Sequence, residues 1–520
     1  MTQARTDSSA LDHRLALRVI LVATALRLLV AAALPLGVDE SYAVVVARTL
    51  SLSWFDHPPA VFWLAHAAAA LGGESPLALR WPFVLLFALT SWLLFRLGAR
   101  LFGTRAGLWT LVVAQVVPVF SLSSGSWVLP DGPLLCASAA TALLLARVAG
   151  VGQATAATDK MNPVRDGWRT WLAMGLSLGL AGLSKYHAAL LGLGVLVFVL
   201  SDAGGRAWLR HPAPYAAVLV ALACVVPVFV WNARHDWASF RFQSGRAAGT
   251  GNPLVALLQN LAGQAGYLFP WVWGPLVVLL GRALRVGPRD RATWLCCCLG
   301  APPVLIFTLA ALGGKPGLPH WPAPGYLLLL PLLGAAMARW ERRAPTVMHR
   351  RTALATAVFA GLLTIVVTHA ATGWVARVIP SLHRTDPAFE LVGYRSLRDS
   401  LHGTGVAAGA SFVAASDWIR GAKVGYAMGP ALPVLVLNDD ARHFRFLPAR
   451  AALAGRDGLV LVTMRRSETA DDVRARSALL AAQFDSLRFV RLMPVMRGAD
   501  TAAMLGLFAG RGLHSPPPRP

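Results

Sequence analysis

Long apolar segments separated by short polar gaps constrain this chain more than any other feature. A helix that crosses a bilayer core needs about 20 apolar residues. Apolar runs of roughly this length occur near residues 15–36, 81–99, 106–123, 130–147, 170–184, 187–201, 213–231, 262–281, 292–312, 321–338 and 353–371. The chain is 56% hydrophobic and only 14% charged, whereas about a quarter of the residues in a soluble domain are charged. The sequence therefore predicts an α-helical polytopic membrane protein with about eleven transmembrane helices.

The basic residues predict how these helices are oriented. Arginines and one lysine cluster in every second gap, at Arg14, Arg18, Arg100, Arg105, Arg147, Lys160, Arg165, Arg169, Arg206, Arg210, Arg282, Arg285, Arg289, Arg291, Arg339, Arg342, Arg343, Arg350 and Arg351. By the positive-inside rule these gaps are cytoplasmic, and so is the N-terminal segment 1–14. The first run lacks a convincing cleavage site and is expected to remain as an anchor. The net charge of +23 then reflects membrane topology, and without a basic-aromatic module we do not expect nucleic-acid binding.

The region after the last apolar run has a different character. Residues 380–510 contain short strand-like runs, GVAAGASFVAAS, LPVLVLN and GLVLVTM, the last followed by a helical pattern over 468–483. This pattern predicts a small extracytoplasmic α/β domain after a transmembrane domain that spans residues 15–371. The proline-rich end, 511–520, is expected to be a disordered tail.

The first gap on the extracytoplasmic side contains an acidic pair, Asp39-Glu40, directly before a helical run. A carboxylate pair next to a membrane core is costly to hold there and is a candidate for function. Alternatively, Asp39 caps a short helix and Glu40 occupies its favourable first turn. The residues alone leave both interpretations open.

The same gap ends in the sequence SWFDHPP. Pro58 and Pro59 cannot continue a preceding helix and disfavour helical backbone in the residue before each of them. The segment therefore predicts a rigid turn that starts the next helix and holds Asp56 and His57 in place. A plain helix start, with Asp56 near the N-terminal dipole, explains the pattern equally well.

Further polar groups lie at the extracytoplasmic ends of later segments. Lysine is rare in this chain, yet Lys185 in LSKYHA and Lys315 in GGKPGLPHWPAP both lie on this side. A lipid-linked phosphate would need cations at this depth, although a lysine that reaches toward water at a helix end is common. Asp131 starts a segment in LPDGP, and Arg241 lies in the aromatic loop WNARHDWASFRFQ, which suits either a sugar or an interfacial belt.

Taken together, these motifs resemble the GT-C membrane glycosyltransferases related to protein O-mannosyltransferases and bacterial aminoarabinose transferases. The resemblance covers roughly residues 15–340. Its most specific part is the Asp-Glu pair, followed by Asp-His-Pro-Pro and then Arg-Trp-Pro at 80–82. The resemblance implies a multi-pass protein of the bacterial inner membrane that transfers a sugar from a polyprenyl-phosphate carrier to a lipid, glycan or protein acceptor on the extracytoplasmic face.

The resemblance also implies roles for individual residues. Asp39 would be the general base, with Glu40 as its neighbour. The other assigned residues would bind substrate: Asp56 and His57 in the wall of the cavity, Asp131 as a second acid, Lys185 and His187 near the carrier phosphate, Arg241 in the aromatic loop, and Lys315, His320 and Trp321 in a mobile loop over the site.

Two other functions and a metal remain open at this stage. A transporter or flippase for lipid-linked glycans would also have many spans, but it should carry ionisable groups near the bilayer midplane and show related halves. A membrane scaffold would leave the first loop unexplained. Asp39, Glu40, Asp56, His57 and Asp131 could assemble a divalent cation site, yet no ligand spacing requires one. The five cysteines also lack the spacing of a metal site.

Overall fold

The structure, a computed structural model, separates into two compact units. It describes residues 2–152, 163–246, 249–379, 381, 386–394, 397, 409–438, 440–447, 450–465 and 469–515. The helical unit contains Met1–Leu29, Leu52–Val61 and Arg80–Ala360, and the sheet unit contains Val30–Ser51, Phe62–Leu79 and Gly361–Pro520. The gap after the first apolar run, predicted to be extracytoplasmic, is therefore divided between the two units.

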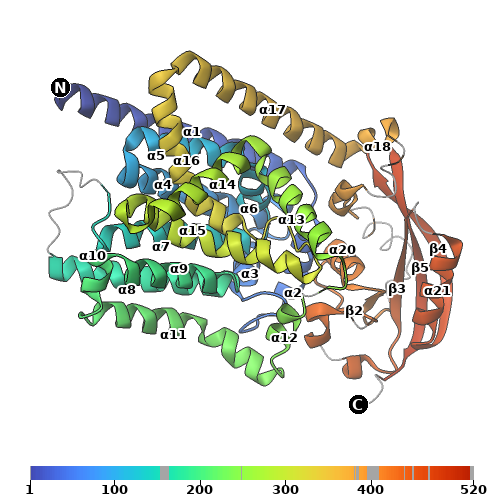
Figure 1. The fold of residues 1–520 in the computed structure, drawn as a ribbon. Coiled ribbons are helices and arrows are strands. Elements are labelled where there is room, and N and C mark those ends of the chain that lie inside the picture. Colours follow the sequence, from blue (N-terminus) through green and yellow to red (C-terminus); the bar gives the residue numbers. More distant parts are fainter. Residues whose placement is uncertain are drawn as a thin grey trace. The chain divides into compact units, whose positions relative to one another are not determined.

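The helical unit is a bundle of long helices joined by short turns (Figure 1). Its helices are α1 (Thr2–Ala33), α4 (Pro76–Phe102), α5 (Thr104–Val116), α6 (Ser124–Ser126), α7 (Asp131–Val148), α8 (Pro163–Ser184), α9 (Ala188–Ser201), α10 (Ala203–Trp208), α11 (Ala213–Arg234), α12 (Ala238–Ser244), α13 (Pro253–Leu268), α14 (Pro270–Val286), α15 (Arg291–Ala310), α16 (Ala323–Arg343) and α17 (Pro345–Thr372). Helices α1, α4 and α17 also extend into the sheet unit.

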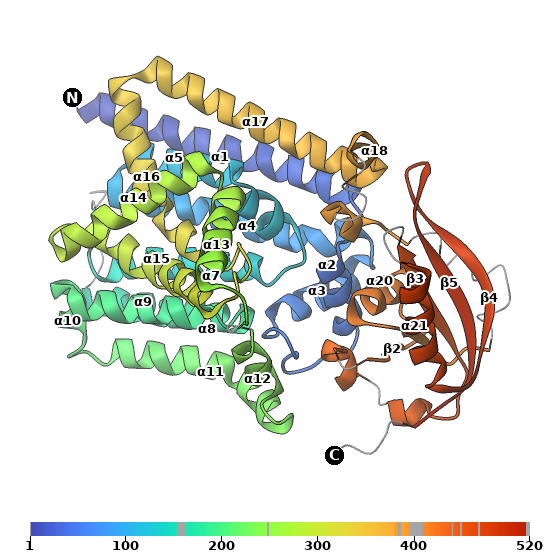
Figure 2. The ribbon, with the colours of Figure 1, turned by 45° about the vertical axis from the view of Figure 1, so that its right-hand side comes forward.

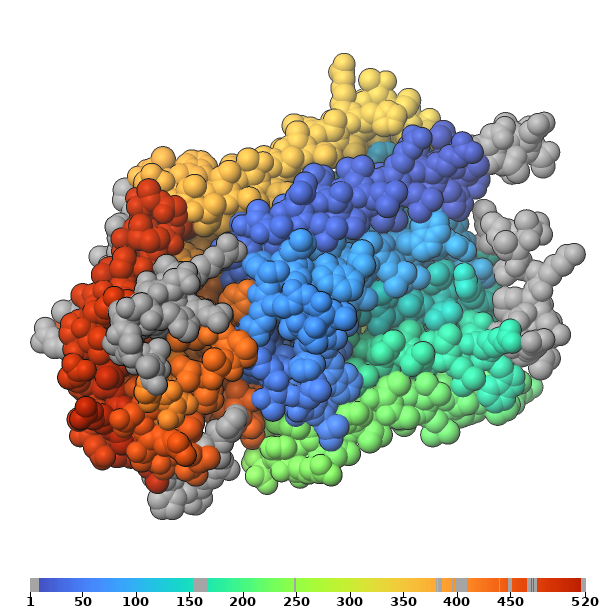
Figure 3. Space-filling view, turned by 180° about the vertical axis from the view of Figure 1, so that it is seen from behind, coloured from blue at the N-terminus to red at the C-terminus, as the bar shows by residue number. Residues whose placement is uncertain are grey.

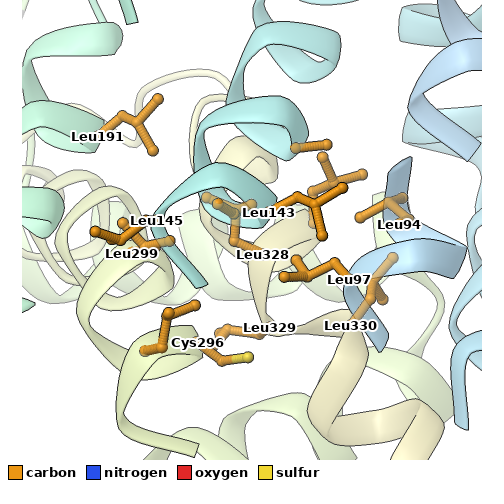
Figure 4. Packing of buried hydrophobic residues seen from close by; sticks show 14 of the residues in the cluster. Leu94, Leu97, Leu143, Leu145, Leu191, Cys296, Leu299, Leu328, Leu329 and Leu330 are labelled. Carbon is orange, nitrogen blue, oxygen red and sulfur yellow. The ribbon is translucent and has the colours of Figure 1, made fainter. Parts of the chain in front are cut away.

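The centre of the helical unit is packed with leucine and alanine from α4, α7, α9, α15 and α16 (Figure 4). Close approach of the helices depends on small residues. A Cβ on Gly107 of α5 would collide with the backbone of α4, and a Cβ on Gly334 of α16 would collide with the backbone of α5. Small residues serve this purpose where helices associate in lipid, because burial in lipid gives little hydrophobic driving force.

Each of the eleven predicted spans falls on a helix or on a pair of helices. By length and composition, six helices of the described residues can cross a membrane, or up to eight if each of two bent pairs counts as one span. The exposed leucines and valines of α1 and α11 fit contact with lipid, and α1 forms a ridge on the surface in Figure 3. The predicted span 187–201 corresponds to α9, which has only 14 residues.

Two predicted spans are bent in the structure. The segment 106–123 turns by 80° after α5, where Pro118 precedes a π-helical turn, Val119–Ser123. The segment 262–281 lies across α13 and α14, which meet at 113°. At that break Phe269 has a positive φ of 67° and precedes Pro270. Proline cannot supply the backbone N–H that a continuous helix needs, and hydropathy alone does not reveal such a bend.

The sheet unit contains a five-stranded sheet in the order β2-β1-β3-β5-β4 (Figure 2). Its elements include α2 (Val38–Ala47), most of α3 (Ala60–Gly72), α18 (Trp374–Val378), β1 (Val413–Ala415), α20 (Trp418–Met428), β2 (Val434–Val436), β3 (Gly458–Arg465), α21 (Ala470–Ala481), β4 (Phe484–Arg497) and β5 (Asp500–Leu513). Strands β1, β2 and β3 are parallel, whereas β5 pairs antiparallel with both β3 and β4.

The predicted strand-like runs correspond to β1, β2 and β3, and the predicted helix corresponds to α21. The β4–β5 hairpin was not predicted from the sequence. Its strands lack a regular alternation of apolar and polar residues, since β4 contains Pro494 and two register shifts. Residues 511–513, expected in the tail, form the end of β5, and residues 516–520 lie outside the described residues.

Within the sheet unit, α2 packs against α20. Arg48, which ends α2, forms a two-bond ion pair with Glu74 at 2.8 and 2.7 Å. Its Nη1 also donates to the carbonyl oxygens of Gly425 and Gly429, at 2.9 and 3.0 Å, where α20 ends. Tyr42 packs between the rings of Trp418 and Phe444. The helix that carries Asp39 is therefore fixed by residues near the C-terminal end of the chain.

We expect Arg48→Met to loosen α2 from α20. The change removes charged hydrogen bonds to Glu74 and to two carbonyl oxygens, and should cost about 2 kcal/mol of local stability. Hydrogen–deuterium exchange should accelerate in residues 38–47 and 418–428. Arg511→Met removes an exposed charge from β5 and should leave both segments unchanged; equal exchange in the two variants would contradict the assigned role of Arg48.

Candidate functional site

A buried ion pair joins the start of α7 to the end of α8 in the helical unit. Lys185 follows the last residue of α8, and its Nζ donates to both carboxylate oxygens of Asp131, the first residue of α7, at 2.9 and 3.0 Å. The side chains are only 4% and 9% exposed. An isolated charge at this depth would be costly, so the two residues depend on each other. Two residues predicted as separate site residues are thus brought into contact.

Aromatic rings surround His187, two residues after Lys185. The His187 ring lies 4.6 Å from Phe307 and 6.4 Å from Trp321, measured between ring centroids. Its Nε2 is buried and has no hydrogen-bond partner among the described residues. Lys185, Asp131, His320 and His57 all interact electrostatically with this ring. An imidazole nitrogen without a partner can donate to or accept from a ligand.

His320 and Arg246 complete the polar cluster of the helical unit. Burial, followed by the charge of Lys185, lowers the pKa of the His320 imidazole to about 4, against an opposing effect of Asp131. His320 is therefore neutral near pH 7. The Arg246 guanidinium lies 5.1 Å from the Trp321 ring centroid and 5.5 Å from that of Phe242, within cation–π range. Arg246 also acts electrostatically on His320.

The SWFDHPP segment is held through its backbone by one face of α12. Ser239 Oγ donates to the Trp54 carbonyl oxygen at 2.9 Å, and Gln243 Nε2 donates to that of Asp56 at 2.6 Å. The rings of Phe55 and Phe242 lie 4.7 Å apart. Asp56 is buried at 5% exposure, and α3 begins at Ala60, directly after the two prolines. The predicted rigid turn is therefore present, and α12 contacts it through two backbone carbonyl oxygens and the Phe55 ring.

The backbone places α12 through a strained turn. Asp236 and Trp237, which precede α12, both have positive φ angles, 52° and 56°. Such angles are uncommon outside glycine and cost about 1–3 kcal/mol each. Asn232 stabilises the turn, because its Oδ1 accepts a hydrogen bond from Ser239 N at 3.1 Å. The strained turn therefore positions α12, the helix that binds the SWFDHPP segment.

The segment GGKPGLPHWPAP is anchored by polar residues of α13. Asn260 Nδ2 donates to the Pro316 carbonyl oxygen at 2.6 Å. Gln264 contacts Asn260 and also the hydroxyls of Thr308 and Tyr326. This network fixes the start of the segment, in which Lys315 is exposed while Trp321 is only partly exposed.

Arg241 is exposed on α12, and the structure does not bring it or Lys315 to the Asp131–Lys185 pair by any contact among the described residues. Their substrate-binding roles remain predictions.

The acidic pair lies in the sheet unit, at the start of α2. Gly37, not Asp39, is the N-cap residue, and Glu40 Oε2 accepts a hydrogen bond from Gly37 N at 2.8 Å. Glu40 is 1% exposed, whereas Asp39 is exposed. Glu40 therefore performs the capping role, and the predicted cap by Asp39 is wrong. The functional role of Asp39, which is exposed, stays a prediction.

The structure gives no support for the divalent cation site that the sequence left open. Among the described residues, no group of three or more His, Cys, Asp or Glu side chains has the geometry to hold a metal ion. Two residues of the cluster, Arg246 and Phe307, were not singled out from the sequence. Arg246 is one of many arginines, and only its position seven residues after Ser239, on the same face of α12 extended by a turn, could have indicated it.

The low pKa of His320 predicts a stability effect. Between about pH 6.5, the pKa of an unfolded histidine, and pH 4, the unfolded chain gains a proton that the folded protein does not, so stability is complete above this range and falls as the pH falls. His320→Gln removes this contribution. The melting temperature of the wild type should therefore drop more than that of the variant between about pH 7.5 and about pH 5; parallel drops would contradict a neutral, half-buried His320.

Comparisons with known proteins agree with this arrangement. A family model described as dolichyl-phosphate-mannose-protein mannosyltransferase matches residues 56–231. The lipid A galacturonosyltransferase RgtD of Rhizobium johnstonii is 26% identical over 312 residues, which are 58% of this chain and 60% of the relative. The chain thus matches less than two thirds of that relative's length.

Solved structures extend the likeness over the whole fold. ArnT from Cupriavidus metallidurans in the apo state has a TM-score of 0.61 and 16% identity, with 97% of this chain and 98% of ArnT covered. ArnT bound to undecaprenyl phosphate has a TM-score of 0.59 at the same 16% identity, with 95% and 97% covered. The likeness includes both the helices and the C-terminal sheet. The chain therefore has a mostly helical fold of the GT-C type, with many apolar helices and a small C-terminal sheet domain.

Proposed function

We propose that this protein transfers a sugar from a polyprenyl-phosphate carrier to a glycolipid acceptor on the extracytoplasmic face of a bacterial membrane. The observation that supports it best is the cluster around the Asp131–Lys185 pair, in which cationic, imidazole and aromatic groups meet at the end of apolar helices. The undecaprenyl phosphate bound by ArnT is a ligand of that chemistry. The relative RgtD acts on lipid A, which favours a lipid-linked saccharide among the acceptors.

The donor phosphate needs hydrogen-bond donors and positive charge as the sugar leaves. Lys185 is already paired with Asp131, so that pair adds little net charge. In the proposal the Arg246 guanidinium and His187 Nε2 both donate to phosphate oxygens. The charge that develops on the leaving phosphate is stabilised by such groups, because they are held in place before the reaction.

The acceptor nucleophile must lose a proton as it attacks the anomeric carbon. Asp39 suits the base better than Glu40, since Glu40 is buried and occupied by the N-cap of α2, while Asp39 is exposed. The proposal has the Asp39 carboxylate take this proton while the bond between the anomeric carbon and the phosphate oxygen breaks.

Replacement of the base tests the reaction. Asp39→Asn should lower transfer by about a thousandfold, the upper part of the range for general base catalysis. Mass spectrometry of membrane glycolipids should show a sugar-bearing species in a deletion strain complemented with the wild type, but not with the variant. Asp485→Asn, which changes an exposed carboxylate of the same unit, should restore the product. An Asp39→Asn strain with normal product would exclude Asp39 as the base, and an unchanged profile in the deletion strain would favour the transporter or scaffold.

Donor binding can be measured apart from transfer. Arg246→Met should weaken binding of undecaprenyl phosphate to the purified protein about tenfold, roughly the value of one charged hydrogen bond, with Arg246→Lys intermediate. Native mass spectrometry provides the affinity. The matched control is Arg210→Met, which removes an exposed arginine from a gap predicted to be cytoplasmic. Equal affinity of Arg246→Met and the wild type would remove Arg246 from the phosphate pocket.

A further inference from the structure

Helix α1 carries a charged side chain, Arg27, inside an apolar stretch. The stretch Ser9–Ala33 is long and apolar enough to cross a membrane. Arg27 lies six residues before its end, which is about 9 Å along a helix, and it is only 8% exposed. Because a guanidinium keeps its charge in proteins, its burial in such a stretch is costly and marks a candidate site.

The contacts of the Arg27 guanidinium do not include a carboxylate. Its Nε donates to the Ser121 carbonyl oxygen at 3.0 Å, and its central carbon lies 4.7 Å from the centroid of the Phe87 ring. No acidic side chain of the described residues pairs with it, whereas the buried Lys185 is paired with Asp131. The positive charge of Arg27 is therefore buried without a counter-charge from the described part of the chain, and such a charge is costly until an anion binds it.

Most of the hydrogen-bonding capacity of Arg27 is also unused. A guanidinium has five N–H groups, and within the described residues only the one on Nε makes a hydrogen bond. Neither Nη1 nor Nη2 has a partner there, and neither of these nitrogens is fully buried. The part of the side chain that a ligand can reach thus includes donors that lie in one plane, an arrangement that matches two oxygens of a phosphate.

The backbone that holds Arg27 in place is irregular. Ser121 belongs to the π-helical turn Val119–Ser123, where the segment 104–126 bends by 80°. The Ser121 carbonyl oxygen also accepts a hydrogen bond from Ser126 Oγ at 3.3 Å. Turns of this kind are frequent at functional sites. Since the turn binds only the Nε side of the guanidinium, it orients Arg27 and leaves the two Nη groups for a ligand.

We propose that Arg27 binds the phosphate of a membrane lipid, with Nη1 and Nη2 donating to two of its oxygens. Helix α1, a ridge on the surface in Figure 3, exposes apolar side chains that fit contact with lipid. They are 58–68% exposed and comprise Leu21, Val22, Leu26 and Leu29. The anions available beside such a helix are the phosphates of lipids, and one guanidinium balances the single negative charge of a phosphodiester.

Two kinds of lipid could supply this phosphate. One is a membrane phospholipid, and the other is the polyprenyl-phosphate carrier of the proposed reaction. The site goes beyond the proposed function, because it is inferred from the burial and contacts of Arg27 and holds for either source. An experiment with both lipids identifies which of them binds.

Binding to the purified full chain tests the site, with native mass spectrometry as the readout. Each lipid is compared with its uncharged counterpart, phosphatidylglycerol with diacylglycerol and undecaprenyl phosphate with undecaprenol. The wild type should bind at least one of the two phosphate lipids tenfold or more tightly than its counterpart, roughly the value of one charged hydrogen bond. Arg27→Met should abolish this preference. Arg27→Lys should retain part of it, because it keeps the charge but loses the two parallel donors.

A matched control and three contrary results make the test decisive. Arg18→Met removes an exposed arginine from the same helix and should bind as the wild type does. The site is overturned by a wild type that prefers neither phosphate lipid, by an unchanged preference in Arg27→Met, or by an equal loss of the charged and uncharged lipids in that variant. Melting curves separate lost binding from lost folding, and Arg27→Lys keeps the test valid if Arg27→Met unfolds.

Sugar transfer separates this site from the proposed function. If phosphatidylglycerol is the ligand, Arg27→Met should leave the affinity for undecaprenyl phosphate unchanged, and if undecaprenyl phosphate is the ligand, that affinity should fall tenfold or more. A wild type that transfers sugar but binds no phosphate lipid through Arg27 would overturn the site while the function stands. Arg27-dependent binding of phosphatidylglycerol by a wild type that transfers no sugar would overturn the function while the site stands.

Discussion

The buried ion pair between Asp131 and Lys185 is the interaction on which the polar cluster of the helical unit depends. Each residue stands at a helix end between apolar segments, where one charge alone would cost several kcal/mol. Together they fix the start of α7 against the end of α8 and set the field in which His187 and His320 lie. A pair that is satisfied internally adds little net charge to the cluster, and the Arg246 guanidinium is a further cation there, in contact with the ring of Trp321.

A second constraint acts on the SWFDHPP segment, whose backbone is hydrogen-bonded to α12. Helix α12 binds the carbonyl oxygens of Trp54 and Asp56 rather than their side chains. This arrangement orders the turn that carries Asp56 and His57. The turn before α12 requires left-handed backbone at Asp236 and Trp237, which is unfavourable for residues other than glycine. Such strain is retained in a protein when the geometry that it produces is needed.

The sequence was sufficient for features that depend on local chemistry. Hydropathy located the helices, and the prolines predicted the helix start at Ala60, whereas the topology indicated by the arginines stays a prediction. Features that depend on distant partners were not predictable. The contact of Lys185 with Asp131 joins residues 54 positions apart, and the roles of Glu40 and Asp39 could be separated only once the cap at Gly37 was known. Arg246 was missed because its position against the rings of Phe242 and Trp321 depends on the fold and cannot be recognised in the sequence.

The division of the chain into units changes how its C-terminal region relates to function. The sequence suggests a separate domain after the last span, but the structure groups residues 30–51 and 62–79 with that region. The reason is physical: α2 buries nine of its ten residues, and within the sheet unit its partners are α20 and the ring of Phe444. Hydrogen bonds with α20 hold both ends of α2. Lys423 donates to the Leu36 carbonyl oxygen before the helix, and the carbonyl oxygens of Gly425 and Gly429 accept from Arg48 after it. A short helix of ten residues has little stability of its own, so the position of Asp39 within this unit is determined by residues almost four hundred positions later.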